Sequence, residues 1–138
     1  MRIDHIAIAV NDLEPALTNF KNVLTIDHID LEDVPTEKVK VAILNLGDTR
    51  IELLQPTVND SPISKFLTEK GEGIHHLAIT ADDIEKDVER ASSNGAKILG
   101  GIRSELVLAN IRSRRWKGST YPFSTRITET GIRKAIRK

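Results

Sequence analysis

The sequence of 138 residues contains no cysteine and no long run of apolar residues. Without cysteine, the chain can form no disulfide, no zinc–thiolate site and no thiol nucleophile. No apolar stretch approaches the roughly 20 residues that a membrane-spanning helix needs, and the first residues lack the apolar segment of an export signal. We therefore expect a cytoplasmic protein without a membrane partner.

The composition is that of a folded globular domain. Apolar residues make up 39% of the chain and charged residues 29%, which argues against disorder and against a collagen-like or membrane protein. A chain of 138 residues corresponds to one domain, at roughly 100–200 residues per domain. We therefore expect residues 1–138 to form a single domain.

The net charge of zero conceals two regions of opposite charge. Residues 1–100 carry 10 basic and 18 acidic residues, a balance of −8, whereas residues 101–138 carry 10 basic and 2 acidic residues, a balance of +8. Such a basic tail is a recognised pointer to nucleic acid. Its basic residues are scattered and match no nucleic-acid-binding motif, so we disfavour a nucleic-acid partner.

An internal repeat with an offset of 71 residues organises the chain. Residues 5–14 (HIAIAVNDLE) align with residues 76–85 (HLAITADDIE), with identical His, Ala, Ile, Asp and Glu at equivalent positions. Ten positions in register indicate a duplication. The predicted division is a first module over about 1–58, a linker helix over about 59–70 and a second module over about 71–138.

Each module is predicted to begin with a strand followed by a helix. The apolar, β-branched segments 3–10 and 74–80 are typical of strands. Asn11 and Asp82 are the predicted helix caps, each with a glutamate three positions later. Further strands of the first module are predicted over residues 26–31, 39–46 and 49–54, with a hairpin turn at Gly47.

The second module departs from this pattern. The linker helix is predicted over residues 61–67, with Ser61 as its cap and Pro62 at its first position, and a strand is predicted over 96–99. The repeat then requires strands near 110–117 and 121–126, but the first segment is basic and the second contains a proline. The predicted fold class is α+β, with two βαβββ modules of which the second is atypical or incomplete at its C-terminus.

Two histidines and a glutamate are candidate metal ligands. His5 and His76 occupy equivalent strand positions, and Glu52 lies in an otherwise apolar strand, where burial without a partner would be costly. Two imidazoles and a carboxylate suit a divalent cation with open coordination positions. The alternative is that each is a hydrogen-bonded structural residue. His75 is predicted to face away from His76, because adjacent residues of a strand alternate.

Four segments together resemble the methylmalonyl-CoA epimerase family, which belongs to the vicinal oxygen chelate superfamily with glyoxalase I and the extradiol dioxygenases. They are residues 4–10, 51–56, 61–67 and 71–78. The first of these is shared across the superfamily, whereas the stretch from Ser61 to His76 is more specific to the epimerases. The resemblance covers residues 1 to about 100.

The resemblance implies two βαβββ modules of a glyoxalase-like fold that curl around a metal. It implies His5, Glu52 and His76 as ligands of a divalent cation (cobalt, manganese, nickel or zinc), an acyl-CoA substrate and a homodimer. It also implies interconversion of (2R)- and (2S)-methylmalonyl-CoA through a metal-stabilised enolate. The alternatives are a glyoxalase or dioxygenase type of activity, which the Ser61–His76 stretch disfavours, and a degenerate ligand-binding domain without catalysis.

Two glutamates are candidate catalytic groups, since epimerisation needs a proton-transfer group on each face of the substrate. The family's fourth ligand, which doubles as one of these groups, is a glutamate in the last strand. Glu129 is the best candidate for it by its distance from His76. The second base of some family members falls on Val41 here, so that role is unassigned, and Glu37 lies nearby without a supporting motif.

The family pattern is absent from about residue 102 onward. The tail is either a genuine basic extension or the product of a frameshift in the coding sequence. Glutamate codons read one base late become lysine and arginine codons, so a frameshift would turn a glutamate-bearing segment basic. Because the charge reversal, the failed repeat and the missing motif begin together, we favour the frameshift.

Overall fold

A computed structural model describes residues 2–99, 105–109 and 126–128, and the side chains of residues 2–96. The described strands form one sheet of eight, in the order β2-β3-β4-β1-β5-β7-β8-β6. The elements of the first half are β1 Arg2–Ala9, α1 Leu13–Val23, β2 Ile29–Val34, η1 Pro35–Glu37, β3 Val39–Leu46 and β4 Thr49–Pro56. The remaining elements are α2 Pro62–Lys70, β5 Gly73–Thr80, α3 Ile84–Ser93, β6 Lys97–Leu99, β7 Glu105–Ala109 and β8 Arg126–Thr128. This α+β architecture confirms the predicted fold class.

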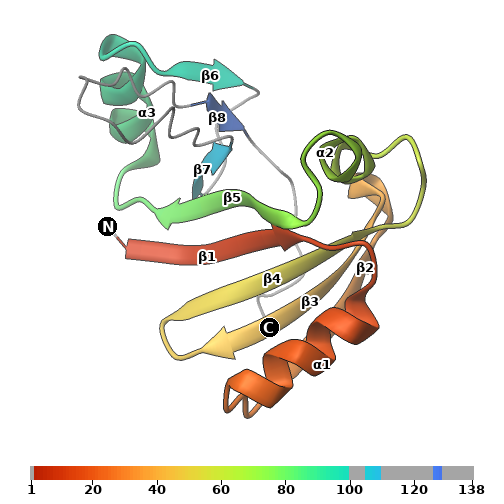
Figure 1. The fold of residues 1–138 in the computed structure, drawn as a ribbon. Helices are drawn as coiled ribbons and strands as arrows, with labels where there is room; N and C mark the ends of the chain where they lie inside the picture. Colours follow the sequence, from red (N-terminus) through yellow and green to blue (C-terminus); the bar gives the residue numbers. More distant parts are fainter. Residues whose placement is uncertain (1, 100–104, 110–125, 129–138) are drawn as a thin grey trace, which may run out of the picture.

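The centre of the sheet is the antiparallel pair β1 and β5 (Figure 1), which are the two strands related by the sequence repeat. On its other edge β1 pairs in parallel with β4, which continues through antiparallel ladders to β3 and β2. In β3 the consecutive residues Val41 to Leu44 are all buried, so both faces of this strand are covered, which explains why it is almost continuously apolar.

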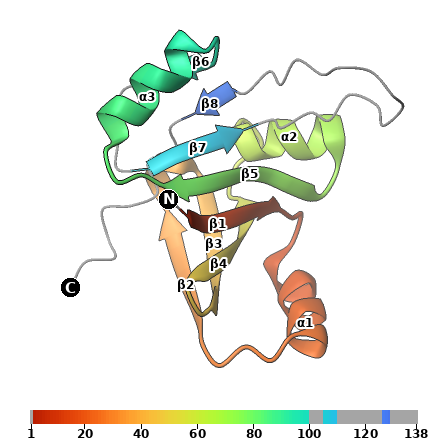
Figure 2. The same cartoon turned by 90° about the vertical axis from the view of Figure 1, so that its left-hand side faces the viewer.

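Each face of the first half-sheet is covered by one helix. On the outer face, Leu13, Leu17 and Phe20 of α1 pack against Leu44 and Leu53. The inner-face cluster consists of Ala7, Ala9, Val39, Val41, Ile43, Leu54 and Ile63, with Phe66 and Leu67 of α2 packed against it. Figure 2 shows α1 and α2 on different sides of this half of the molecule.

The starts of the first and third helices lie one residue beyond the predicted caps, so Glu14 and Glu85 stand two rather than three residues after the cap. The caps are Asp12, whose carboxylate accepts from the Glu14 backbone N–H, and Asp83, whose carboxylate accepts from the Lys86 backbone N–H. The prediction of Asn11 and Asp82 is therefore wrong by one position, because the next residue in each copy also has a capping side chain. The α2 start is as predicted, with Ser61 as cap.

The hairpin between β3 and β4 is confirmed, with Gly47 at a φ of 73°, but the second strand is displaced from its predicted position. It spans Ile29–Val34 because it must pair with β3, where Ile29 lies opposite Leu44 and Val34 opposite Val39. Ile26, at the predicted start, instead packs against the outer-face cluster from the preceding loop.

The second half of the sheet differs in topology from the first. The neighbour of β5 is β7, which runs antiparallel to it, whereas β1 has the parallel β4 at the equivalent place. β8 pairs with β7 and β6. β7 was not predicted, although residues 106–108 are an apolar run of Leu, Val and Leu.

Most residues of the two tail strands predicted by the repeat lie outside the described part of the chain. Residues 110–117 lie outside the described residues, and of 121–126 only Arg126, the first residue of β8, is described. The division into two modules and a linker remains a prediction. In the described part of the chain, no helix is long and apolar enough to cross a membrane.

Candidate metal centre

The inner face of the three central strands brings together the three predicted ligands. Ala7 of β1 lies opposite both Glu52 of β4 and His76 of β5, and laterally paired residues share a face of a sheet. His5 lies two residues before Ala7 and points to the same face. The side chains of His5, Glu52 and His76 are 4%, 0% and 2% exposed, so all three are effectively removed from solvent.

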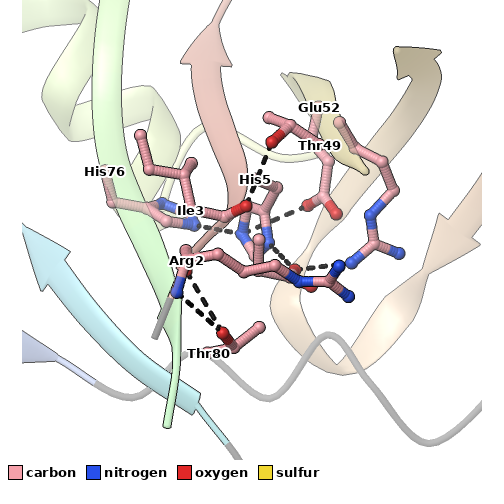
Figure 3. Close-up of polar contacts among 9 residues, drawn as sticks. Arg2, Ile3, His5, Thr49, Glu52, His76 and Thr80 are labelled. Atoms are coloured by element: carbon pink, nitrogen blue, oxygen red, sulfur yellow. Dashed lines mark hydrogen bonds and ion pairs between the residues drawn. The ribbon is translucent and has the colours of Figure 1, made fainter. Parts of the chain in front are cut away.

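His5 lies between the other two side chains (Figure 3). Its Nε2 atom is 3.1 Å from His76 Nε2 and 3.6 Å from Glu52 Oε2. The two imidazole rings meet edge to face, with their centroids 5.2 Å apart. Three strands that are separate in sequence therefore bring an imidazole nitrogen of His76 and a carboxylate oxygen of Glu52 close to His5 Nε2.

A β-bulge orients His5. Ile3 and His5 lie opposite the consecutive residues Ile79 and Ala78, so Asp4 is the extra residue, and such a bulge re-aims a side chain. The Asp4 carboxylate lies 2.8 Å from His5 Nδ1 and 2.5 Å from Arg50 Nη2. A carboxylate accepts hydrogen bonds, so Asp4 accepts from His5 Nδ1 and from Arg50, and this contact turns the Nε2 edge of His5 toward His76 and Glu52.

A second bulge lies before His76. Ala7 and Ile8 lie opposite His76 and Ile74, so His75 is the extra residue, at the position related to Asp4 by the 71-residue repeat. His75 Nδ1 lies 2.8 Å from His76 Nδ1. The prediction that His75 faces away from His76 is therefore wrong, because strict alternation fails at a bulge.

Burial controls the charge of the two adjacent histidines. Burial lowers the pKa of His76 to about 3, with smaller contributions from His75 and His5. Burial also lowers the pKa of His75 to about 4, helped by Lys70. Both rings are therefore neutral at physiological pH, which is the form in which imidazole binds a metal.

Two of the separations between candidate donors are close to those between ligands of a divalent cation. At a metal–nitrogen distance of about 2.1 Å, neighbouring ligands lie about 3.0 Å apart in octahedral and about 3.4 Å apart in tetrahedral coordination. The separations of 3.1 and 3.6 Å from His5 Nε2 are close to these values. Within the described residues, however, no group of three or more His, Cys, Asp or Glu side chains is placed so that it could hold a metal ion, and the predicted fourth ligand, Glu129, lies outside them.

The structure does not bring Glu37 to this centre. Glu37 ends η1, which precedes the first residue of β3, and that residue, Val39, lies opposite Pro56. Pro56 is four residues beyond Glu52, or about 13 Å along the strand at about 3.3 Å per residue. Glu32 is better placed, since it lies opposite Val41 and thus shares the inner face. The sequence analysis missed Glu32 because its predicted strand ended at residue 31.

A comparison of the sequence with known families decides the relationship. The sequence model of the glyoxalase/bleomycin resistance protein/dioxygenase superfamily matches residues 4–108. The chain belongs to this superfamily. The match begins within β1 and ends within β7, so the superfamily relationship includes all three candidate ligands.

Individual members of the superfamily confirm the resemblance to the epimerases. The ethylmalonyl-CoA/methylmalonyl-CoA epimerase of Cereibacter sphaeroides is 39% identical over 100 residues, which cover 72% of this chain and 75% of the relative. Human mitochondrial methylmalonyl-CoA epimerase is 43% identical over 88 residues, covering 63% of this chain but only half of the human protein. A variant of Streptomyces coelicolor methylmalonyl-CoA epimerase, solved with 2-nitronate-propionyl-CoA, has a TM-score of 0.68 at 27% identity, covering 80% of this chain and 85% of that chain.

Proposed function

We propose that this chain is a metal-dependent epimerase that interconverts (2R)- and (2S)-methylmalonyl-CoA. The observation that carries the proposal is that the buried Nε2 atom of His5 lies 3.1 Å from His76 Nε2 and 3.6 Å from Glu52 Oε2 on the inner face. The similarity to proteins that are named as methylmalonyl-CoA epimerases supports the reaction and the acyl-CoA substrate. A homodimer remains a prediction of the family resemblance.

His5, Glu52 and His76 would hold the cation. Cobalt, manganese, nickel and zinc all accept such a set of imidazole and carboxylate ligands. When bound, the ion supplies Lewis acidity that stabilises negative charge on the thioester oxygen. The Asp4–Arg50 pair holds the His5 ring in place, and the strands β1, β4 and β5 give the three ligands a rigid support.

The proton transfers need two groups that flank the α-carbon, because the proton leaves one face of the substrate and returns to the other. Glu32 is our candidate within the described residues, since the strand register places it on the inner face beside Val41. Glu37 lies farther along the sheet and is the less favoured of the two. Glu129 remains the predicted source of the other carboxylate.

The test is exchange of the α-proton of methylmalonyl-CoA in deuterated water, followed by NMR with added Co²⁺ or Mn²⁺. We expect exchange well above the rate in buffer, its loss with a chelator, and its loss in His5→Ala. The matched control is His28→Ala. His28 is an exposed histidine immediately before β2, and among the described contacts it bonds only Asp30. A folded wild-type chain that catalyses no exchange would contradict the proposal.

A further inference from the structure

The inner face of β2, β3 and β4 carries one basic side chain. Arg50 lies opposite His5 on the neighbouring strand and two residues before Glu52, so it shares the inner face with both. The other inner-face positions of these three strands hold acidic, amide or apolar residues. Arg50 is therefore the one guanidinium that these strands present beside the candidate site.

An ion pair fixes the guanidinium group of Arg50. Its Nη2 atom lies 2.5 Å from Asp4 Oδ2, and the Arg50 side chain is 17% exposed. A guanidinium is a planar fork of several N–H donors, and among the contacts described Arg50 makes only this hydrogen bond. Asp4 also accepts from His5 Nδ1. Arg50 is thus held beside His5 with most of its donors left for a ligand.

The basic residue of β1, Arg2, has different surroundings. Its side chain is 62% exposed, and its Nη1 atom lies 3.8 Å from Asp48 in the turn between β3 and β4. Water screens the charge of such an exposed guanidinium. An anion that reaches Arg50 is screened less, because the Arg50 side chain is largely removed from water. Of these two arginines, Arg50 is therefore the stronger anion receptor.

The proposed substrate brings a second polar group to this face. Methylmalonyl-CoA carries a free carboxylate on the same carbon that loses and regains the proton. A carboxylate that enters a largely buried face without a partner loses its hydration at a cost. An arginine offsets this cost, because its planar donors match the two oxygens of a carboxylate. The two epimers have the same carboxylate and thioester, so one carboxylate receptor serves both.

We propose that Arg50 binds the free carboxylate of the substrate and thereby selects 2-carboxyacyl thioesters over acyl thioesters that lack this group. The inference rests on the proposed epimerase function, but it requires no bound cation. Arg50 holds the carboxylate on one side of the lateral row that contains Glu52. Glu32, the candidate for proton transfer, lies on the other side of that row, in register with Val41 and Leu54.

The test compares two thioesters that differ only in the carboxylate, namely propionyl-CoA and methylmalonyl-CoA with its epimers at equilibrium. Isothermal titration calorimetry of the full chain with Co²⁺ measures both dissociation constants. We expect the wild type to bind methylmalonyl-CoA roughly 10–100-fold more tightly, as for a hydrogen bond between charged groups. The preference should persist when EDTA replaces Co²⁺, because it resides in Arg50 and not in a cation.

Substitutions of Arg50 separate carboxylate binding from structural support. Arg50→Met removes the guanidinium, so we expect the affinity for methylmalonyl-CoA to fall roughly 10–100-fold and that for propionyl-CoA to stay at the wild-type value. Arg50→Lys keeps the charge but not the planar fork and should retain part of the preference. The matched control is Arg90→Met, which removes an arginine of α3 that also pairs with an aspartate, Asp87. It should bind both thioesters as the wild type does.

Three results would overturn the proposal. The first is a wild type that binds the two thioesters equally, or binds neither, which needs no variant to establish. The second is an Arg50→Met variant that loses affinity for both thioesters by the same factor, because this would give Arg50 only a structural role through Asp4. The third is a preference that disappears with EDTA, which would assign the carboxylate to a cation.

Exchange of the α-proton, measured on the same samples, tests the epimerase function separately. A preference that depends on Arg50 in a chain without exchange would contradict the epimerase function and support the carboxylate receptor. Exchange in a chain without the preference would support the epimerase function and overturn the role of Arg50.

Discussion

The two halves of the sheet begin alike and end differently. In the first half, β4 returns parallel to β1 and places Glu52 beside the strand of His5. In the second half, β7 takes the place next to β5 and runs antiparallel. The position related to Glu52 by the repeat is Phe123, which lies outside the described residues. The first half thus supplies two of the three donors and the second half supplies one.

The halves also differ in packing. Of the 13 buried apolar residues among the described side chains, only Ala78 comes from the second half. α1 buries Leu13, whereas α3 has no buried residue among its described side chains. Within the described side chains, the buried apolar core therefore lies almost wholly outside the second half, and β5 carries His76 into the centre by pairing with β1.

The largest expected effect tests whether both halves contribute to the metal centre. His5→Ala and His76→Ala each remove a direct donor, so each should weaken Co²⁺ binding by more than about 100-fold, beyond the loss typical of a ligand's hydrogen-bonding partner. Isothermal titration calorimetry measures both. Equal losses of Co²⁺ affinity support a site shared by the two halves. Normal binding by either variant would show that the half carrying that histidine supplies no ligand.

The difference in packing can be tested through stability. Leu54→Ala removes a fully buried side chain of the first half and should cost about 2–5 kcal/mol. Val88→Ala in α3 removes a half-buried side chain and should cost about 1 kcal/mol. Urea unfolding of the full chain measures both values, and similar costs would show that the second half is packed as tightly as the first.

A third comparison is between two Asp–His contacts, the buried one of Asp4 with His5 and the exposed one of Asp30 with His28. Asp4→Asn replaces the carboxylate at His5 and leaves Arg50 without its charged partner, so we expect a roughly 10–100-fold loss of Co²⁺ affinity. Asp30→Asn removes a similar but exposed Asp–His contact and is the matched control. Unchanged affinity in Asp4→Asn, with the fold intact, would show that the carboxylate does not orient His5.

Acid should destabilise the metal-free chain. The pKa of His75 is lowered to about 4 and that of His76 to about 3 in the folded state, so the unfolded chain binds more protons below the ordinary histidine pKa of about 6.5. The contribution of these two histidines to the free energy of unfolding should be constant above pH 6.5. It should fall as the pH drops toward 4. Urea unfolding across this range, with His75→Gln showing a shallower decrease, checks the sign.

The smallest expected effect concerns the helix that joins the halves. The Ser61 hydroxyl caps α2 and accepts from the Ser64 backbone N–H at 3.0 Å, so Ser61→Ala should cost about 1 kcal/mol. Thermal unfolding measures the change. Because α2 packs on the inner-face cluster rather than on the ligands, Co²⁺ affinity should be retained, and its loss would show that α2 supports the centre directly.

The sequence predicted those elements whose local signals and tertiary context agree. The repeat located β1 and β5, and the apolar run and Gly47 located the β3–β4 hairpin. Local sequence patterns did not predict the bounds of a strand where its pairing with a neighbouring strand sets them. Ile26 has a strand-forming side chain but lies outside β2, since the ladder with β3 begins at Ile29.

The sequence predicted three side chains that lie close together on the inner face, but not the residues that contact them. His5, Glu52 and His76 were found because the repeat and an isolated carboxylate mark them. Asp4 and His75 contact the ligands because of two bulges, and a bulge cannot be read from alternation. The register places Glu32 on the inner face only once the bounds of β2 are known.

The most direct test of the account is a calorimetric titration of the full chain with Co²⁺ at pH 8, beside the variant Glu52→Leu. The account predicts one saturable site per chain in the wild type. It predicts binding weaker by more than about 100-fold in the variant, which lacks a direct donor but keeps a similar volume. Absence of saturable binding in the folded wild type, or equal affinity in the two proteins, would contradict the claim that three adjacent strands build one cation site.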